Sequence, residues 1–236
     1  VGFMFALFDS TVKILDDVHA DIVLLSPARY ALPAEKRISA ARLNQARSCP
    51  GVAAVHPLYI ERAGAALYPT PAGKGYPIRV IGYSLQPGIF KAPEVDAQAE
   101  LLREPDTALI DSQSKRPHFN FALDDLVRFG PPSATAASQS ASQGSEARTP
   151  FPGSRNRVVA ELSGRRINLV GTFPSGTDFA NDGNLILSDR NFAKYFPWRG
   201  DGEPLDIVDL GLVQIEPGTD QAAVRAFFAA ESIDEV

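Results

Sequence analysis

One segment of this chain cannot take part in a hydrophobic core. The stretch PPSATAASQSASQGSEARTP, residues 131–150, contains no bulky apolar side chain. Because such a segment buries too little apolar surface to offset the entropy lost on ordering, we predict a mobile surface loop over about 130–155. The core of the 236-residue chain must therefore come from the two flanking parts, as one large domain or two small ones.

The two ends of the chain alternate between strand and helix signals. The continuous apolar run Ile22–Leu25 predicts a strand buried on both faces, and Ser39 is a suitable N-cap for a short helix over 39–48. Near the other end, residues 207–215 predict a strand, and Thr219 is the expected cap of a final helix. Its buried stripe is formed by Val224, Phe227 and Phe228.

The middle of the chain carries mainly strand signals. Two extended runs flank TPAGKG and predict a hairpin of residues 52–68 with 76–85, and VVAEL and INLVGTF flank SGRR in the same way. Further strands are expected at 107–110 and 184–187, the latter followed by a short helix that Ser188 or Asp189 caps. Ends of α/β character around a β-rich middle predict one subdomain inserted into another.

The N-terminal stretch VGFMFALF is apolar on every side and turns amphipathic from Asp9 onward. Eight apolar residues are too few to cross a bilayer, which needs about 20. Because the chain does not start with Met, we expect it to be part of a longer protein, with residues 1–15 as the stub of a transmembrane helix. A buried N-terminal helix is the alternative that this pattern leaves open.

Composition excludes some functions. The net charge is −5 and no basic face is visible, so nucleic acid is not an expected partner. The single cysteine, Cys49, cannot form an intramolecular disulfide, and we expect a partly buried, unreactive thiol.

The stretch from Gly171 to Asp189, GTFPSGTDFANDGNLILSD, resembles two kinds of ligand loop. A phosphate loop needs lysine after its second glycine, but Gly176 is followed by Thr177 and Asp178. A calcium loop starting at Asp178 would place Ala180 where an oxygen ligand is needed. Asp182 and Gly183 would fit its fifth and sixth positions, with Asp189 at the twelfth. We therefore interpret the stretch as a connection between strands.

Other residue types that carry chemistry are scattered. The histidines, His19, His56 and His118, have no metal-ligand partner at close spacing. The serines at 10, 26 and 84 lack a nucleophile-elbow context, and the adjacent pairs Asp16-Asp17 and Asp124-Asp125 are better explained as solvated faces than as acid/base pairs. We predict no catalytic residue, no cofactor and no metal site, and no enzymatic activity.

The chain resembles the extracytoplasmic domain of DevC-type permeases, relatives of MacB among the FtsX-like ABC transporter permeases. The resemblance covers nearly the whole chain in order, and residues 131–150 look longer than is typical for the family. The segments that carry it are FDSTVKILDDVHADIVLLSP, RISAARLNQARSCPGVAAVHPLYI, IRVIGYSLQPGIFKAPEV, TALIDSQSKRPHF, SGRRINLVGTFPSGTDFANDGNLILSDRNFAKYF and DIVDLGLVQIEPGTD.

This resemblance implies an α+β, MacB-like periplasmic domain between the first and second transmembrane helices of a permease. A porter-like α/β subdomain is expected at 16–105 plus 205–236. A β-rich, sabre-like subdomain is expected as an insertion at 106–204, carrying the mobile loop 130–155. The full gene is then expected to encode three further hydrophobic spans after residue 236.

The resemblance also implies a function without catalysis. Such a domain lies in the periplasm, on a protein of the inner (cytoplasmic) membrane. It docks a membrane-fusion (HlyD-like) adaptor and transmits ATP-driven motion, so that substrate is exported. The implied partners are a cytoplasmic ABC ATPase, a TolC-like outer-membrane channel reached through the adaptor, and a second permease copy. DevC-type permeases are linked to glycolipid export, which points to a glycolipid or other hydrophobic cargo. A free extracytoplasmic ligand-binding protein or hydrolase is the alternative.

Overall fold

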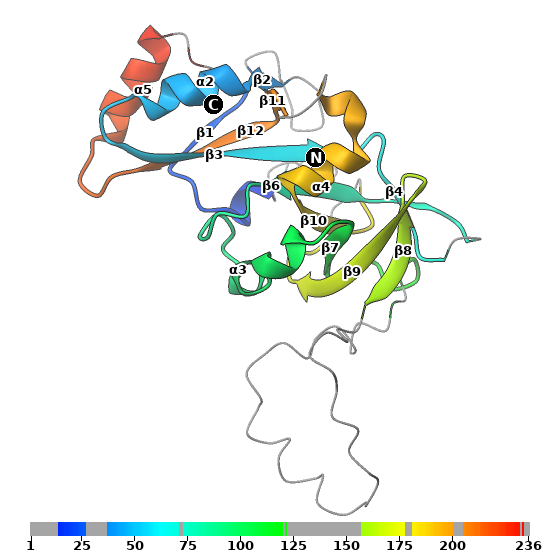
Figure 1. Ribbon diagram of the computed structural model, residues 1–236. Coiled ribbons are helices and arrows are strands. Elements are labelled where there is room, and N and C mark those ends of the chain that lie inside the picture. The colour runs from blue at the N-terminus through cyan, green and yellow to red at the C-terminus, as the bar shows by residue number, and fades with distance from the viewer. Residues whose placement is uncertain are drawn as a thin grey trace, which may run out of the picture.

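Ten strands of the computed structural model form one mixed sheet within the residues that it describes, namely 14–26, 37–70, 73–119, 121, 157–177, 181–200, 205–231 and 233 (Figure 1). In order across the sheet they are β1 (Ile22–Leu24), β12 (Leu210–Ile215), β3 (Val52–Glu61), β6 (Arg79–Tyr83), β10 (Asn184–Ser188), β7 (Thr107–Asp111), β9 (Arg165–Phe173), β8 (Val158–Leu162), β4 (Ala66–Tyr68) and β5 (Tyr76–Pro77).

The remaining elements flank this sheet. Strands β2 (Ile38–Ser39) and β11 (Ile207–Val208) pair separately. The helices are α2 (Ala40–Arg47), α3 (Pro93–Ala97), α4 (Asp189–Tyr195) and α5 (Gln221–Ala230), with 3-10 turns η1 (Ala99–Arg103) and η4 (Pro197–Arg199). Most strand pairs are antiparallel, whereas β10 with β6 and β7 with β9 are parallel. The predicted α+β class is confirmed.

Two hydrophobic clusters cover the opposite faces of the sheet. In β7, Ala108 and Ile110 belong to one cluster while Leu109 belongs to the other, and all three are fully buried. This explains why β7 and β10 are almost continuously apolar, as is typical of strands buried on both faces. Helices α2, α4 and α5 contribute to the first cluster, and α3 with η1 to the second.

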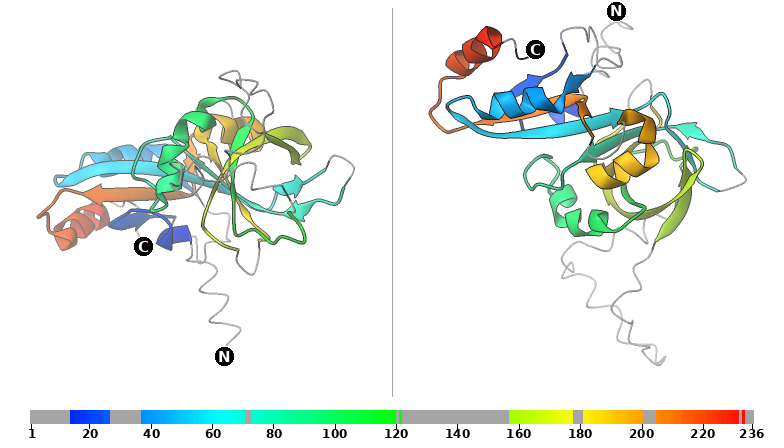
Figure 2. Two further views of the ribbon diagram at one scale, coloured as in Figure 1. Left: turned by 90° about the horizontal axis from the view of Figure 1, so that it is seen from below. Right: turned by 45° about the horizontal axis from the view of Figure 1, so that its top comes forward.

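Strand β3 is the longest strand and joins the two ends of the molecule. Its residues from Val52 to Leu58 pair with β12, and its residues from Leu58 to Glu61 pair with β6. Figure 2 shows α2 and α5 near one end of β3, and α4, β8 and β9 near the other. Strand β6 comes from the range predicted as porter-like and pairs with β10 from the inserted range. The division into subdomains stays a prediction.

Both predicted hairpins are present. Tyr59 lies opposite Gly82 and Leu67 opposite Tyr76, so the two arms around TPAGKG pair along β3–β6 and β4–β5. In the second hairpin, β8 and β9 are joined by Ser163 and Gly164 with φ angles of 49° and 81°. Two successive positive φ angles match a type I′ turn, whose twist suits neighbouring strands.

The predicted helix starts are confirmed with one correction. Ser39 accepts a hydrogen bond from the Ala41 amide, and Ser188 accepts one from Asn191. The final helix is capped by Asp220 and not by Thr219, since the Asp220 carboxylate accepts a hydrogen bond from the Ala222 amide at 2.9 Å. Of its predicted stripe, Val224 and Phe228 are buried and Phe227 is partly buried.

The predicted single strand over 207–215 is wrong at one position. Strand β11 pairs with β2, strand β12 pairs with β3 and β1, and Asp209 separates them. The Asp209 carboxylate accepts a hydrogen bond from the Ile60 amide at 2.8 Å. This buried polar contact interrupts the strand.

Within the described ranges, no helix is both long and apolar enough to cross a membrane. The loop predicted at 130–155 and most of the predicted first helix lie outside those ranges.

Candidate functional site

The segment that resembled a phosphate loop is held by a buried carboxylate. Residues 171–173 belong to β9, and the chain then turns past the end of β7. There Asp111, fully buried, accepts hydrogen bonds from the amides of Ser175 at 3.2 Å and Gly176 at 2.9 Å. The backbone N–H groups that a phosphate would need are therefore already bound to a carboxylate, and an anion would be repelled there.

Asp111 is the centre of a polar junction between distant parts of the chain. Its carboxylate also accepts from the Gln113 amide at 2.9 Å and from Asn184 Nδ2 at 2.8 Å. Ser175 Oγ donates to Asp17 Oδ2 at 2.6 Å. The junction thus joins β7, β10, the turn after β9 and the residue that follows the helical turn 14–16. Its donors and acceptors are groups of the protein itself.

A buried arginine lies close to this junction. Arg79 is 4% exposed, and burial, with the positive charge of Arg62, lowers the pKa of its guanidinium to about 10. The negative charges of Asp17 and Asp111 raise this pKa and so act in the opposite direction.

The adjacent pair Asp16-Asp17 was predicted to lie on a solvated face. This holds for Asp16, which is exposed, but Asp17 is half-buried and serves as a hydrogen-bond acceptor.

Asp182, a candidate calcium ligand in the sequence, lies within hydrogen-bond distance of two basic side chains. Lys115 Nζ donates to Asp182 Oδ1 at 2.6 Å, and His118 Nδ1 lies 2.6 Å from Oδ2. Burial raises the pKa of Asp182, but the hydrogen bonds and charges of Lys115 and His118 outweigh burial and hold this pKa below its usual value. Residues 178–180, with Asp178 and Ala180, lie outside the described ranges. In the part of the chain that the structure describes, no three His, Cys, Asp or Glu side chains gather as metal ligands.

The His118–Asp182 pair resembles half of a hydrolase triad but has no nucleophile in place. His118 stacks on Tyr76 with ring centroids 4.1 Å apart. Ser114 is buried, and its hydroxyl has no hydrogen-bond partner among the described residues, His118 included. A triad requires a hydrogen bond between the hydroxyl and the imidazole. The described residues thus provide a salt-bridged surface cluster.

The other singled-out residues are dispersed. His19 donates its amide to the Ile89 carbonyl, and His56 lies on β3, where burial lowers the pKa of its imidazole. Cys49 is buried, and burial raises the pKa of its thiol, which agrees with the prediction of an unreactive cysteine. Ser26 is buried, Ser84 is half-buried, and Ser10, Asp124 and Asp125 lie outside the described ranges.

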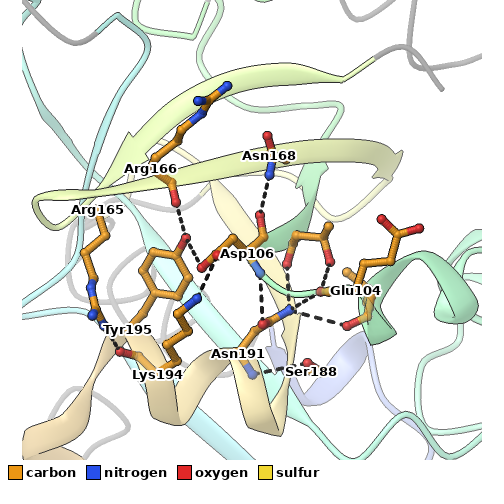
Figure 3. Close-up of polar contacts among 11 residues, drawn as sticks. Glu104, Asp106, Arg165, Arg166, Asn168, Ser188, Asn191, Lys194 and Tyr195 are labelled. Atoms are coloured by element: carbon orange, nitrogen blue, oxygen red, sulfur yellow. Dashed lines mark hydrogen bonds and ion pairs between the residues drawn. The ribbon is translucent and has the colours of Figure 1, made fainter. Parts of the chain in front are cut away.

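Helix α4 is the centre of a second polar network, drawn in Figure 3. Asn191, buried on this helix, donates to the Glu104 carbonyl at 2.9 Å and accepts from the Asp106 amide at 3.1 Å. Lys194 Nζ donates to Asp106 Oδ2 at 2.7 Å, and the Tyr195 hydroxyl bonds to Asp106 as well. Burial and the Asp106 charge raise the pKa of Tyr195. These contacts fix α4 against the loop before β7.

A cavity of about 490 Å³ adjoins this network. Its lining comes from the loop before β7, from α4 with the turn after it, and from the segment that leads to β11. Three cationic side chains contribute: Arg103, Arg190 and Lys194. The apolar part includes Phe196 and Leu205. Volumes of this size are typical of small-molecule sites.

Sequence reasoning missed a buried ion cluster at the junction of β3 and β12. Arg199, 2% exposed, donates to the Ile60 carbonyl at 2.6 Å and to Glu61 Oε2 at 3.1 Å, and it also pairs with Asp209. Arg37 lies 3.3 Å from the same Asp209 carboxylate. Arg199 stands alone between Trp198 and Gly200, and this local sequence does not predict a buried ion pair.

The role of Asp111 could have been suspected from the sequence, because a charged residue there directly follows the apolar run of β7.

Comparisons with known proteins give structural matches only. No protein-family model matches the chain, and no curated protein matches its sequence. The extracellular domain of the noncanonic ABC-type transporter YknZ from Gram-positive bacteria matches with 11% identity and a TM-score of 0.48, over 92% of this chain and 97% of that one. The periplasmic region of MacB from Actinobacillus actinomycetemcomitans matches with 9% identity and a TM-score of 0.47, over 90% of this chain and 84% of that one.

Proposed function

We propose that this chain is the non-catalytic, extracytoplasmic domain of an ABC exporter permease of the MacB/FtsX-like family. It lies in the periplasm, outside the inner membrane. It docks a membrane-fusion adaptor and passes on motion that a cytoplasmic ATPase generates, so that substrate moves outward through a TolC-like channel. In the full-length permease it acts as a homodimer. The end-to-end sequence resemblance motivates this proposal.

The observation that carries the mechanical part is the meeting of both ends of the described chain at one edge of the sheet. Strand β1, near the N-terminal end, pairs with β12, which precedes the last helix, through the register Ile22 with Val213. The Asp21 amide donates to the Val213 carbonyl and the Asp21 carboxylate accepts from the Ile215 amide at 2.9 Å. A displacement applied to either end therefore reaches the same two strands.

The polar junction around Asp111 supports a route for this displacement. Asp17 is bound to Ser175, and backbone bonds join His19 to Ile89 and Lys91 to Asp17. Residues 17–19 are thus attached to the loop before α3 and to the turn after β9. Packed, hydrogen-bonded elements move as rigid bodies, which is what transmission of motion requires.

Adaptor docking is tested with the full-length permease in membranes. We expect the periplasmic region of the cognate adaptor to co-purify with the permease and to be lost when this domain is replaced by a short Gly/Ser linker. The ATPase should still co-purify with the replaced permease, which is the control for its insertion. Absence of adaptor association with the intact permease would refute the docking role.

Transmission is tested separately in the complete transporter. The variants Asp17→Ala and Ser175→Ala each remove the bond between Asp17 and Ser175, and we expect each to reduce adaptor-stimulated ATP hydrolysis. Ser112→Ala is the matched control, because Ser112 bonds the Phe173 carbonyl at the same end of β7 but does not contact Asp17. Unchanged stimulation in both variants, with adaptor association intact, would contradict the proposed route.

A further inference from the structure

The geometry points to the cavity beside α4 as a binding site for a small anionic amphiphile, meaning a carboxylate or phosphate group joined to an apolar body. This inference does not rest on the proposed function. It rests on which side chains line the cavity and on which of them are already engaged.

The charged lining has one sign. Arg103, Arg190 and Lys194 line the cavity, and no acidic side chain does so among the described residues. Lys194 is paired with Asp106, and Arg103 is paired with Glu100, both of whose side chains are largely exposed. The guanidinium of Arg190 has no hydrogen-bond or ion-pair partner among the described residues, although its backbone amide bonds to Asp189. Within the described residues its guanidinium is thus the one cation of this lining that is not already paired, and a guanidinium binds a carboxylate or phosphate in a bidentate manner.

The uncharged polar lining is already satisfied. Ser188 Oγ accepts the Asn191 amide, and the Asn191 side chain bonds to the loop at Glu104 and Asp106 (Figure 3). These groups cannot select a neutral polar ligand without losing their own hydrogen bonds. They hold α4 in place, so that the cavity is formed before a ligand arrives, as is usual for small-molecule sites.

The apolar part of the lining indicates that the ligand also has an apolar body. Phe196, Leu205 and Ala193 belong to it, and they lie within one cavity with the cations. Removing an apolar body from water against such side chains is favourable at about 25 cal/mol per Å². A bare phosphate would leave this part of the cavity unused, and a neutral alkyl chain would leave Arg190 unpaired.

The chain carries its own reporter for binding. Trp198 is its only tryptophan, and its ring lies 5.4 Å from that of Phe196, which lines the cavity. Trp198 is 60% exposed, so its fluorescence can respond to a nearby ligand. Binding is measured by titrating decyl phosphate below its micelle concentration, with inorganic phosphate and decyl maltoside in parallel, and calorimetry provides a second readout.

We expect saturable binding of decyl phosphate and at least tenfold weaker binding of both inorganic phosphate and decyl maltoside. Arg190→Ala should weaken decyl phosphate binding about tenfold or more, the range for loss of a charge-assisted hydrogen bond. Ala193→Phe should abolish it by filling the cavity while keeping its charge. Arg42→Ala is the matched control, since Arg42 is a half-buried arginine on α2 outside the cavity lining, and it should bind like the unmodified chain.

Several results would overturn the inference. Absence of binding in both readouts would do so, as would equal binding of inorganic phosphate or of decyl maltoside, or an affinity that Arg190→Ala leaves unchanged. Vesicles of phosphatidylglycerol distinguish the source of the ligand. If these vesicles compete with decyl phosphate, the site is supported and its ligand is a membrane lipid. If decanoate competes and the vesicles do not, the site is supported and its ligand is a free amphiphile.

Discussion

Asp111 shows what one carboxylate can contribute when its position in the fold gives it several donors. It follows the buried strand β7, is itself fully buried, and accepts from Gln113, Ser175, Gly176 and Asn184. A buried carboxylate is costly unless it is hydrogen-bonded, and here the bonds meet that requirement. The glycine-rich turn after β9 keeps its conformation because this acceptor is present.

Asp111→Ala should lower the free energy of unfolding by about 3 kcal/mol, because it leaves three backbone amides without an acceptor and removes one of the acceptors of Asn184 Nδ2. Asp111→Asn should cost less, since one carbonyl oxygen remains. Urea unfolding of the isolated chain measures both. Ser112→Ala removes only the 3.3 Å bond to the Phe173 carbonyl and should stay within about 1 kcal/mol. Equal values for Asp111→Ala and Ser112→Ala would contradict the role of Asp111 as the central acceptor.

The buried ion cluster around Arg199 predicts a second large effect at the residue scale. Arg199→Met leaves the buried carboxylates of Glu61 and Asp209 without their main partner and should cost about 3–5 kcal/mol. Adding Glu61→Gln and Asp209→Asn should recover part of this loss, because the uncompensated charges disappear. Thermal and urea unfolding test both steps, with exposed Arg190→Ala as a control expected within about 0.5 kcal/mol. A small effect of Arg199→Met would show that water reaches the cluster.

Asp182 predicts a pH dependence. The bonds to Lys115 and His118 outweigh burial and depress its pKa below 3.8, so its stabilising contribution is present above pH 3.8 and is lost as the pH falls through the lower folded value. The difference in unfolding free energy between the unmodified chain and Asp182→Asn should therefore shrink as the pH falls below about 4. Measuring it again with His118→Gln in both chains isolates the Lys115 partner. A difference that grows on acidification would reverse the sign and reject the assignment.

At the scale of elements, the start of α5 shows how local signals compete. Thr219 and Asp220 are both capable caps, and the sequence pattern favours the first, whereas Asp220 makes the hydrogen bond. The turn after β12 decides between them. The Glu216 amide bonds back to the Gly51 carbonyl and the Thr219 amide to the Glu216 carbonyl, which places the helix start one residue later.

Asp220→Ala should destabilise the chain by about 1 kcal/mol, because the first turn of α5 loses its side-chain acceptor. Asp220→Asn keeps a capping oxygen and should cost only a few tenths of a kcal/mol. Thr219→Ala is the matched control and should cost less than Asp220→Ala in the same chemical unfolding experiment. The reverse order would restore Thr219 as the cap.

At the scale of the whole molecule, the composition of residues 131–150 predicts a segment that does not belong to the core. Deleting residues 133–147 should leave the melting temperature nearly unchanged, because this segment has no bulky apolar side chain to bury and shortening a loop changes the closure entropy only slightly. Replacing the same residues by a Gly/Ser segment of equal length controls for chain length. A fall of many degrees in either variant would mean that the segment packs or pairs.

Local sequence patterns predict much of the fold. The sequence correctly predicts the hairpins around TPAGKG and SGRR, the caps Ser39 and Ser188, and the buried strands β1, β7 and β10. It does so because turn chemistry, capping and apolar periodicity each depend on a few adjacent residues. The negative conclusion on a phosphate loop also follows from adjacent residues. The composition predicted a chain with a packed core, while the loop predicted at 130–155 stays a prediction.

Only the tertiary structure decided which distant residues meet. Strand β3 could be predicted as a strand, but not as the strand shared by β12 and β6. The local sequence also does not predict three pairings. These are the bond of Asp17 with Ser175, the ion pair of Arg199 with Asp209, and the position of Arg190 and Phe196 around one cavity. The physical reason is that capping and turn formation depend on a few adjacent residues. Buried charges and cavities depend instead on which strands the sheet places side by side.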